Sequence, residues 1–137
     1  MKTALLVIDM QNDYLWENRK KLFSYDTARL TASVNALVYR CRLVIFIRLI
    51  IQNLPTNRLL FGYSIAGTEG AKLYGGLDIV SEYRFDKYFG DLFTNRTLGK
   101  LFRDQGVETV HLCGLDECGC VAAMALGAVK RGFRAEM

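Results

Sequence analysis

Two mainly apolar runs constrain the fold of this chain more than any other feature of its sequence. They read ALLVID at residues 4–9 and LVIFIRLI at residues 43–50, and both are rich in Val, Ile and Leu. Strands without polar alternation are typical of parallel sheets that are covered on both faces. Three further segments, 77–80, 107–114 and 133–137, are also predicted to be strands. We therefore expect a mainly parallel sheet with helices on both sides.

Helical patterns alternate with these strands. Asp26 can cap a helix whose apolar residues recur at helical spacing. A second helix is predicted from about Asp91 to Gln105, with Gly106 just beyond its end, and a third opens near Cys120. The repeated strand and helix predict a Rossmann-like, three-layer α/β/α architecture.

Composition limits the domain number and the partners. The chain has 137 residues, of which 51% are hydrophobic, enough for one core, so residues 1–137 are expected to form a single domain. The net charge is +4 and the basic residues are scattered, which disfavours a nucleic-acid partner. The longest apolar run contains Arg48 and is too short to cross a bilayer, so no membrane association is expected.

The N-terminus and the cysteines suggest a compartment. The first apolar stretch ends at Asp9 and no small-residue cleavage site follows, so it does not resemble a signal peptide. A cytoplasmic location is expected. The four cysteines would then stay reduced rather than form disulfides.

The stretch GLDECGCV at residues 114–121 is the first candidate for chemistry. Cys120 is placed to begin a helix, where unpaired N–H groups and the helix dipole can stabilise a thiolate or an oxyanion. Asp9 ends the first strand, and open α/β sheets bind ligands beyond the carboxyl ends of their strands, where the strand order reverses. If the first and fourth strands are neighbours there, Asp9 and Cys120 face the same site.

Other uses of these cysteines stay open at this point. His111, Cys113, Cys118 and Cys120 could hold a metal, but His111 and Cys113 lie on a predicted strand, whereas zinc ligands usually come in short pairs on turns. A redox pair normally has two residues between its cysteines, and here there is one. Buried thiols without any chemistry are a further alternative. Position alone favours Cys120 as a nucleophile.

Three segments in a fixed order carry a resemblance to a known family. They are ALLVIDMQNDY at 4–14, YRFDKYFGDLF at 83–93 and VHLCGLDECGCVAAMALGAVKRGF at 110–133. Together they resemble the isochorismatase-like cysteine hydrolases, a superfamily that includes nicotinamidases and N-carbamoylsarcosine amidohydrolase-like enzymes. The resemblance implies a hydrolase that cleaves an amide-type carbon–nitrogen bond of a small molecule through a thioester, without a cofactor.

The resemblance also assigns roles to individual residues. It implies a catalytic triad of Asp9, Lys87 and Cys120, with Gln11 supporting Asp9. In this reading Asp9 accepts the thiol proton, and Lys87 holds the thiolate and carboxylate charges together.

An oxyanion site is implied by the same resemblance. The N–H of Cys120 and one N–H from the loop between Leu115 and Gly119 would bind the oxyanion. The peptide that joins Leu115 to Asp116 is expected to be cis, a costly geometry found mainly at functional sites.

The chain departs from the family in two places. Nicotinamidases have an Asp-x-His metal motif after the second strand, where this chain reads IRLIIQNLPTNR at 47–58, so no metal is expected. The family also normally continues beyond residues 133–137. We therefore expect C-terminal elements to be missing and the exposed edge to favour a homo-oligomer. The alternative function is a catalytically silent member that acts as an interaction or structural protein.

Overall fold

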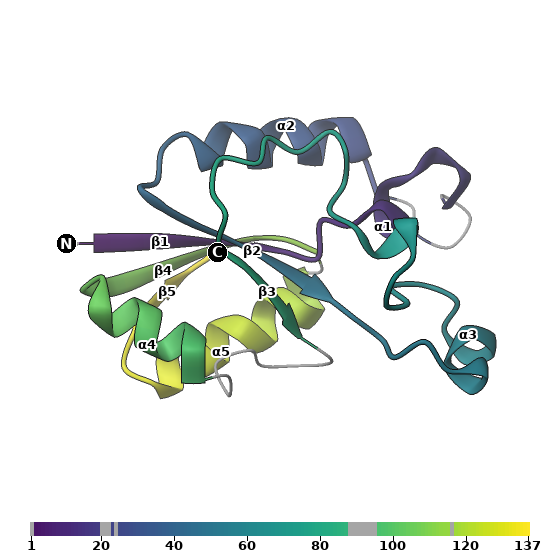
Figure 1. The fold of residues 1–137 in the computed structure, drawn as a ribbon. Coiled ribbons are helices and arrows are strands. Elements are labelled where there is room, and N and C mark those ends of the chain that lie inside the picture. Colours follow the sequence, from purple (N-terminus) through teal and green to yellow (C-terminus); the bar gives the residue numbers. More distant parts are fainter. Residues whose placement is uncertain (1, 20–22, 24, 88–95, 116) are drawn as a thin grey trace.

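The fold is a five-stranded parallel sheet between two layers of helices (Figure 1). The computed structural model describes residues 2–19, 23, 25–87, 96–115 and 117–137. The strand order is β3-β2-β1-β4-β5, and the strands are β1 (Lys2–Ile8), β2 (Leu43–Leu49), β3 (Arg84–Lys87), β4 (Val107–Gly114) and β5 (Arg134–Glu136). The predicted α/β architecture is confirmed.

β1 lies at the centre of the sheet and packs on both faces. Leu5 and Val7 belong to one apolar cluster, together with residues of α2 (Thr27–Val38). Leu6 and Ile8 point to the opposite face and pack with residues of α4 (Arg96–Asp104) and α5 (Ala122–Lys130). Figure 1 shows α2 on one side of the sheet and both α4 and α5 on the other. The unbroken apolar run is therefore explained by burial on both faces.

Helix ends follow the local signals in the sequence. The Asp26 carboxylate accepts a hydrogen bond from the N–H of Arg29 at 3.3 Å and caps α2 as predicted. α4 ends just before Gly106, whose φ of +66° is the left-handed conformation that closes many helices. The predicted start of this helix near Asp91 lies outside the described residues.

The strand predicted at residues 77–80 is wrong. These residues lie in an irregular segment, where the N–H of Asp78 donates to the side chain of Asn35 and Ile79 is 42% exposed. The third strand is β3, at Arg84–Lys87. β3 is an edge strand with alternating exposed residues, so charges at its outer positions hide it in a search for apolar runs.

The long connections carry only short helices. α1 (Asn12–Leu15) follows β1, and α3 (Pro55–Leu60) lies between β2 and β3 and projects from the rest of the molecule (Figure 1). Both lie toward the end of the molecule to which β1 and β2 run. Among the described residues, no helix is long and apolar enough to cross a membrane.

Candidate active site

The strand order reverses between β1 and β4. These strands are paired in parallel with Ile8 opposite Gly114, which confirms that they are neighbours. Gly114 has a φ of +109°, and a Cβ there would lie 2.1 Å from the carbonyl oxygen of Ile8. Only glycine fits this position, because any side chain would collide with the β1 backbone. This close approach brings the loop that leads to Cys120 beside the end of β1.

Asp9 is the first residue after β1, and it combines an unfavourable backbone conformation with a buried carboxylate. Its φ is +55°, in the left-handed region that non-glycine residues rarely occupy, and its residue exposure is 3%. Its N–H donates to the carbonyl of Ile47 at 2.9 Å, which fixes the turn. Strained backbone together with a buried carboxylate is typical of functional sites.

Lys87 reaches Asp9 from two strands away. It is the last residue of β3, and β2 lies between β3 and β1. Two strand spacings amount to about 10 Å, so only a long side chain can cross this distance. The Lys87 Nζ lies 3.2 Å from the Asp9 Oδ2, and both side chains are almost completely buried. The ammonium lowers the pKa of Asp9, but burial is the larger effect and leaves that pKa raised.

Cys120 is partly buried next to this ion pair. Burial raises the pKa of its thiol, the negative charge of Asp9 and hydrogen bonding with Asp9 raise it further, and Lys87 opposes both effects. The pKa of this thiol is therefore raised, contrary to the expectation that the helix start would lower it, mainly because the thiol is partly buried and also because a carboxylate lies beside it. The arrangement instead favours a neutral thiol with a proton acceptor at hand.

Leu115 does not have the role in the oxyanion loop that was expected of it. The N–H of Leu115 donates to the carbonyl of Ile8 at 2.8 Å, so it is already used and cannot bind an oxyanion. Asp116, and with it the predicted cis peptide, lies outside the described residues. Gly119 has non-helical backbone angles, so a distorted turn separates this loop from α5. The backbone N–H of Cys120 stays the candidate donor.

Gln11 supports the site through the backbone. Its amide nitrogen donates to the carbonyls of Leu49 and Ala71 at 2.9 and 2.8 Å, and its amide oxygen accepts from the N–H of Leu49 at 2.9 Å. Leu49 is paired with Lys87 in the sheet. Gln11 thus holds the end of β2, on which the position of Lys87 depends.

The remaining described cysteines have a different environment. Burial raises the pKa of Cys113 to about 12, and it packs against the apolar cluster on the α2 side of the sheet. Cys41 packs against the same cluster. Cys120 is the one of these three free thiols that lies beside a carboxylate and an ammonium.

The segment after β2 lacks the metal ligands that nicotinamidases have there. This segment reads IIQN at 50–53 and contains neither Asp nor His, and Ile50 and Ile51 are buried. Within the described part of the chain, no group of three or more His, Cys, Asp or Glu side chains gathers at one point. The residues present therefore do not fit a metal site of that kind.

Three further residues near the site escaped the sequence analysis. The Tyr14 hydroxyl and the Ser64 Oγ are 2.8 Å apart, and the N–H of Ser64 donates to Asp13 at 2.9 Å. Burial is the main cause of the raised pKa of Tyr14, and the charges of Asp9 and Cys120 contribute. Tyr14 therefore lies close to the reacting groups. The polar residues that follow Gln11 could have pointed to this part of the site. Ser64 could not be found in the same way, because it is distant in sequence.

A buried carboxylate and ammonium lie beside a thiol at the switch point of a parallel sheet, the place where open α/β sheets bind ligands. Residues 3–137 match the model of the isochorismatase domain. The chain belongs to the isochorismatase family, and it is accordingly a hydrolase.

Individual relatives agree with this assignment. The chain is 26% identical to an isochorismatase-family protein of Bacillus subtilis, YddQ, over 134 residues that cover 97% of this chain and 73% of that protein. A nicotinamidase/pyrazinamidase of B. subtilis superposes with a TM-score of 0.80 at 28% identity, covering 98% of this chain and 82% of the other. For N-carbamoylsarcosine amidase of Thermoplasma acidophilum, the TM-score is 0.77 at 26% identity, with coverages of 98% and 80%.

Proposed function

We propose that this hydrolase cleaves a carbon–nitrogen bond of a small amide, with Cys120 as the nucleophile. The observation that carries the proposal is the buried contact of 3.2 Å between Lys87 and Asp9, with the Cys120 thiol beside both groups. Two similar structures are amidases by name. The cysteine itself favours attack on an amide carbonyl, which needs a nucleophile.

The first half of the reaction forms a thioester. The Cys120 thiol gives its proton to the Asp9 carboxylate as the sulfur attacks the carbonyl carbon. The raised pKa of Asp9 makes this carboxylate a better base than an ordinary aspartate. The N–H of Cys120 stabilises the oxyanion. Asp9 then returns the proton to the leaving nitrogen, which departs as ammonia or an amine.

The second half restores the enzyme. Water attacks the thioester carbonyl and gives a proton to Asp9, the carbon–sulfur bond breaks, and the sulfur takes that proton back as a thiol. The product is a carboxylic acid. Throughout the cycle Lys87 offsets whichever negative charge is present on Asp9 or Cys120, because it is buried next to both.

The test is ammonia release from a panel of small amides that includes nicotinamide and N-carbamoylsarcosine. Cys120→Ala should lower turnover by roughly a thousandfold or more, as loss of a nucleophile generally does. Cys41→Ala removes a thiol away from the ion pair and should retain turnover. The proposal fails if no amide of the panel is hydrolysed, or if Cys120→Ala retains the wild-type turnover. The first result would favour the silent interaction protein.

Two finer expectations accompany this proposal. Self-association to a homo-oligomer and a cytoplasmic location both stay predictions. Light scattering on the purified protein tests the first, and a stable monomer would contradict it.

A further inference from the structure

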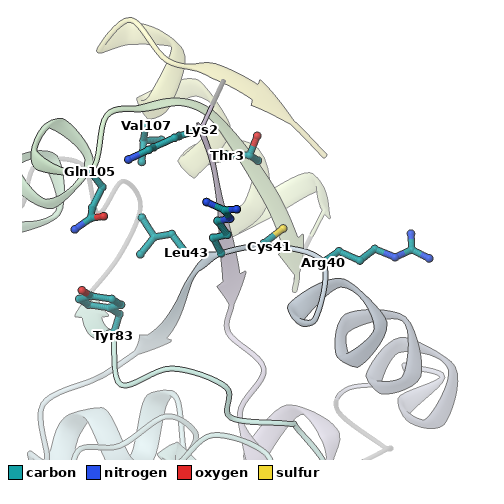
Figure 2. A pocket seen from close by; sticks show the side chains of 9 residues that line it. Lys2, Thr3, Arg40, Cys41, Leu43, Tyr83, Gln105 and Val107 are labelled. Atoms are coloured by element: carbon teal, nitrogen blue, oxygen red, sulfur yellow. The ribbon is translucent and has the colours of Figure 1, made fainter.

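A hollow lies at the end of the sheet opposite to the ion pair. It has a volume of about 580 Å³ and is lined where β1, β2 and β4 begin, by residues such as Lys2, Leu43 and Val107. Tyr83, just before β3, and Gln105, just after α4, complete it. Figure 2 shows these side chains around the hollow. β1 spans the distance from here to Asp9, about 20 Å for a strand of this length.

The charged residues that line this hollow are all basic among those the structure describes. Lys2, Arg40 and Arg42 line it, and no acidic residue among the described ones does so. None of the three forms an ion pair with a described residue, whereas Arg48 pairs with Asp86 elsewhere on the sheet. Cations that share a hollow repel one another unless an anion joins them, so the arrangement favours an anionic ligand.

The three cations are not equivalent. In Figure 2, Lys2 and Gln105 lie on the same side of the hollow, whereas the long side chain of Arg40 extends away from it. Arg40 is therefore the least suited of the three to contact an anion in the hollow, which leaves Lys2 and Arg42 as the candidates. An arginine fork together with a lysine is well suited to phosphate oxygens.

The rest of the lining is partly apolar. Leu43 and Val107 provide an aliphatic surface, and the ring of Tyr83, which is 42% exposed, also lines the hollow (Figure 2). The volume falls within the range of small-molecule sites and exceeds what a bare phosphate ion needs. The basic residues of the chain form no long stripe with interleaved aromatics, which disfavours a nucleic acid.

We propose that this hollow binds the phosphate group of a small organic molecule with an aromatic or apolar portion. Lys2 and Arg42 bind the phosphate, and the Tyr83 ring and Leu43 contact the organic part. The inference does not rest on the proposed hydrolysis, because the hollow and the ion pair lie at opposite ends of β1.

Calorimetry with ADP as the probe tests the proposal. The wild-type protein should bind ADP, and adenosine, which has no phosphate, should bind at least tenfold more weakly. Lys2→Gln and Arg42→Gln should each weaken ADP binding roughly threefold to tenfold, as expected for one charge-assisted contact at an exposed site. Arg40→Gln should have a smaller effect. Arg58→Gln, on α3, removes the same charge far from the hollow and should leave binding unchanged.

The outcomes separate specific binding from general attraction of charge. Melting temperatures of the variants close to the wild-type value would show that each still folds. The proposal is overturned if ADP does not bind at millimolar concentration, or if adenosine binds as well as ADP. Equal weakening by Arg58→Gln and Arg42→Gln would also overturn it, as would binding to phosphatidylglycerol vesicles without binding to ADP.

Discussion

The two ends of β1 differ in whether their charged side chains are buried and paired. At its carboxyl end, Asp9 and Lys87 are each 3% exposed and pair with one another. At its amino end, Lys2 is exposed and lines a hollow with two arginines that form no ion pair with any residue the structure describes. Burying charge costs free energy unless the partner is well placed, whereas an exposed charge costs little and remains available to a ligand. The buried end is therefore suited to chemistry and the exposed end to binding.

The strongest test of this comparison sets the buried ion pair against a half-exposed ion pair that also involves β3. Lys87→Met leaves the Asp9 carboxylate buried without its cation and should lower the free energy of unfolding by about 3–5 kcal/mol. Arg48→Met breaks the half-exposed pair with Asp86 and should cost less than about 1 kcal/mol. Urea denaturation followed by circular dichroism measures both.

A further variant separates lost charge from lost packing. Asp9→Asn/Lys87→Met removes both charges, so it should be more stable than Lys87→Met alone. Similar losses for Lys87→Met and Arg48→Met would contradict the claim that the two pairs differ because of burial.

The close approach of β4 to β1 gives the next largest effect. Gly114→Ala should lower the free energy of unfolding by roughly 3 kcal/mol, because the new Cβ meets the Ile8 carbonyl and the backbone has a positive φ. Gly75→Ala is the matched control, since nothing lies within 4 Å of its Cβ position. That change should stay within about 0.5 kcal/mol. Equal stability of the two variants in thermal denaturation would refute this account of the switch point.

Gln11 offers a smaller test at the same end of the sheet. Gln11→Leu keeps the approximate size but leaves the backbone groups of Leu49 and Ala71 without their partner. We expect a loss of about 2 kcal/mol in the free energy of unfolding. Asn57→Leu removes an exposed hydrogen bond to Gln52 and should have little effect, because water replaces the partner. A Gln11→Leu protein as stable as the wild type would show that the network does not hold β2.

The smallest expected effect is a shift in pH dependence. Asp9 must be ionised to accept the thiol proton, and burial raises its pKa above the ordinary value of 3.8. Activity should therefore fall as the pH decreases through that raised pKa, not through the ordinary one. The measurement is kcat/KM against pH for any amide that is hydrolysed. An acid limb at or below the ordinary aspartate value would mean that Asp9 is not the base.

Burial explains which parts of the fold could be predicted. β1 and β2 are covered on both faces, so their apolar runs identify them without reference to the rest of the chain. β3 is an edge strand, and its charged outer residues conceal it. Ile79 and Val80 form an apolar pair but remain 42% and 41% exposed. Local hydrophobicity cannot show whether another part of the chain will cover such residues.

The site could be predicted only in part for a related reason. The position of Asp9 follows from a strand end, whereas Lys87 is implied only by the family resemblance, and the structure pairs the two residues. The pKa of Cys120 is raised by burial and by Asp9, which is distant in sequence, so the position of Cys120 at the start of a helix does not predict it. The contact between Tyr14 and Ser64, 50 residues apart in the chain, leaves no local pattern at all. Contacts between residues distant in sequence therefore determine features of the site that local motifs do not predict.

The most direct test of the central claim is to identify the acylated residue during turnover. An amide that the wild-type protein hydrolyses is mixed with it, the reaction is quenched in acid, and the peptides are analysed by mass spectrometry. The account predicts that the acyl group of the substrate is attached to Cys120, and that Cys120→Ala yields neither adduct nor ammonia. Undiminished turnover by Cys120→Ala, or an acyl group on another residue, would contradict it.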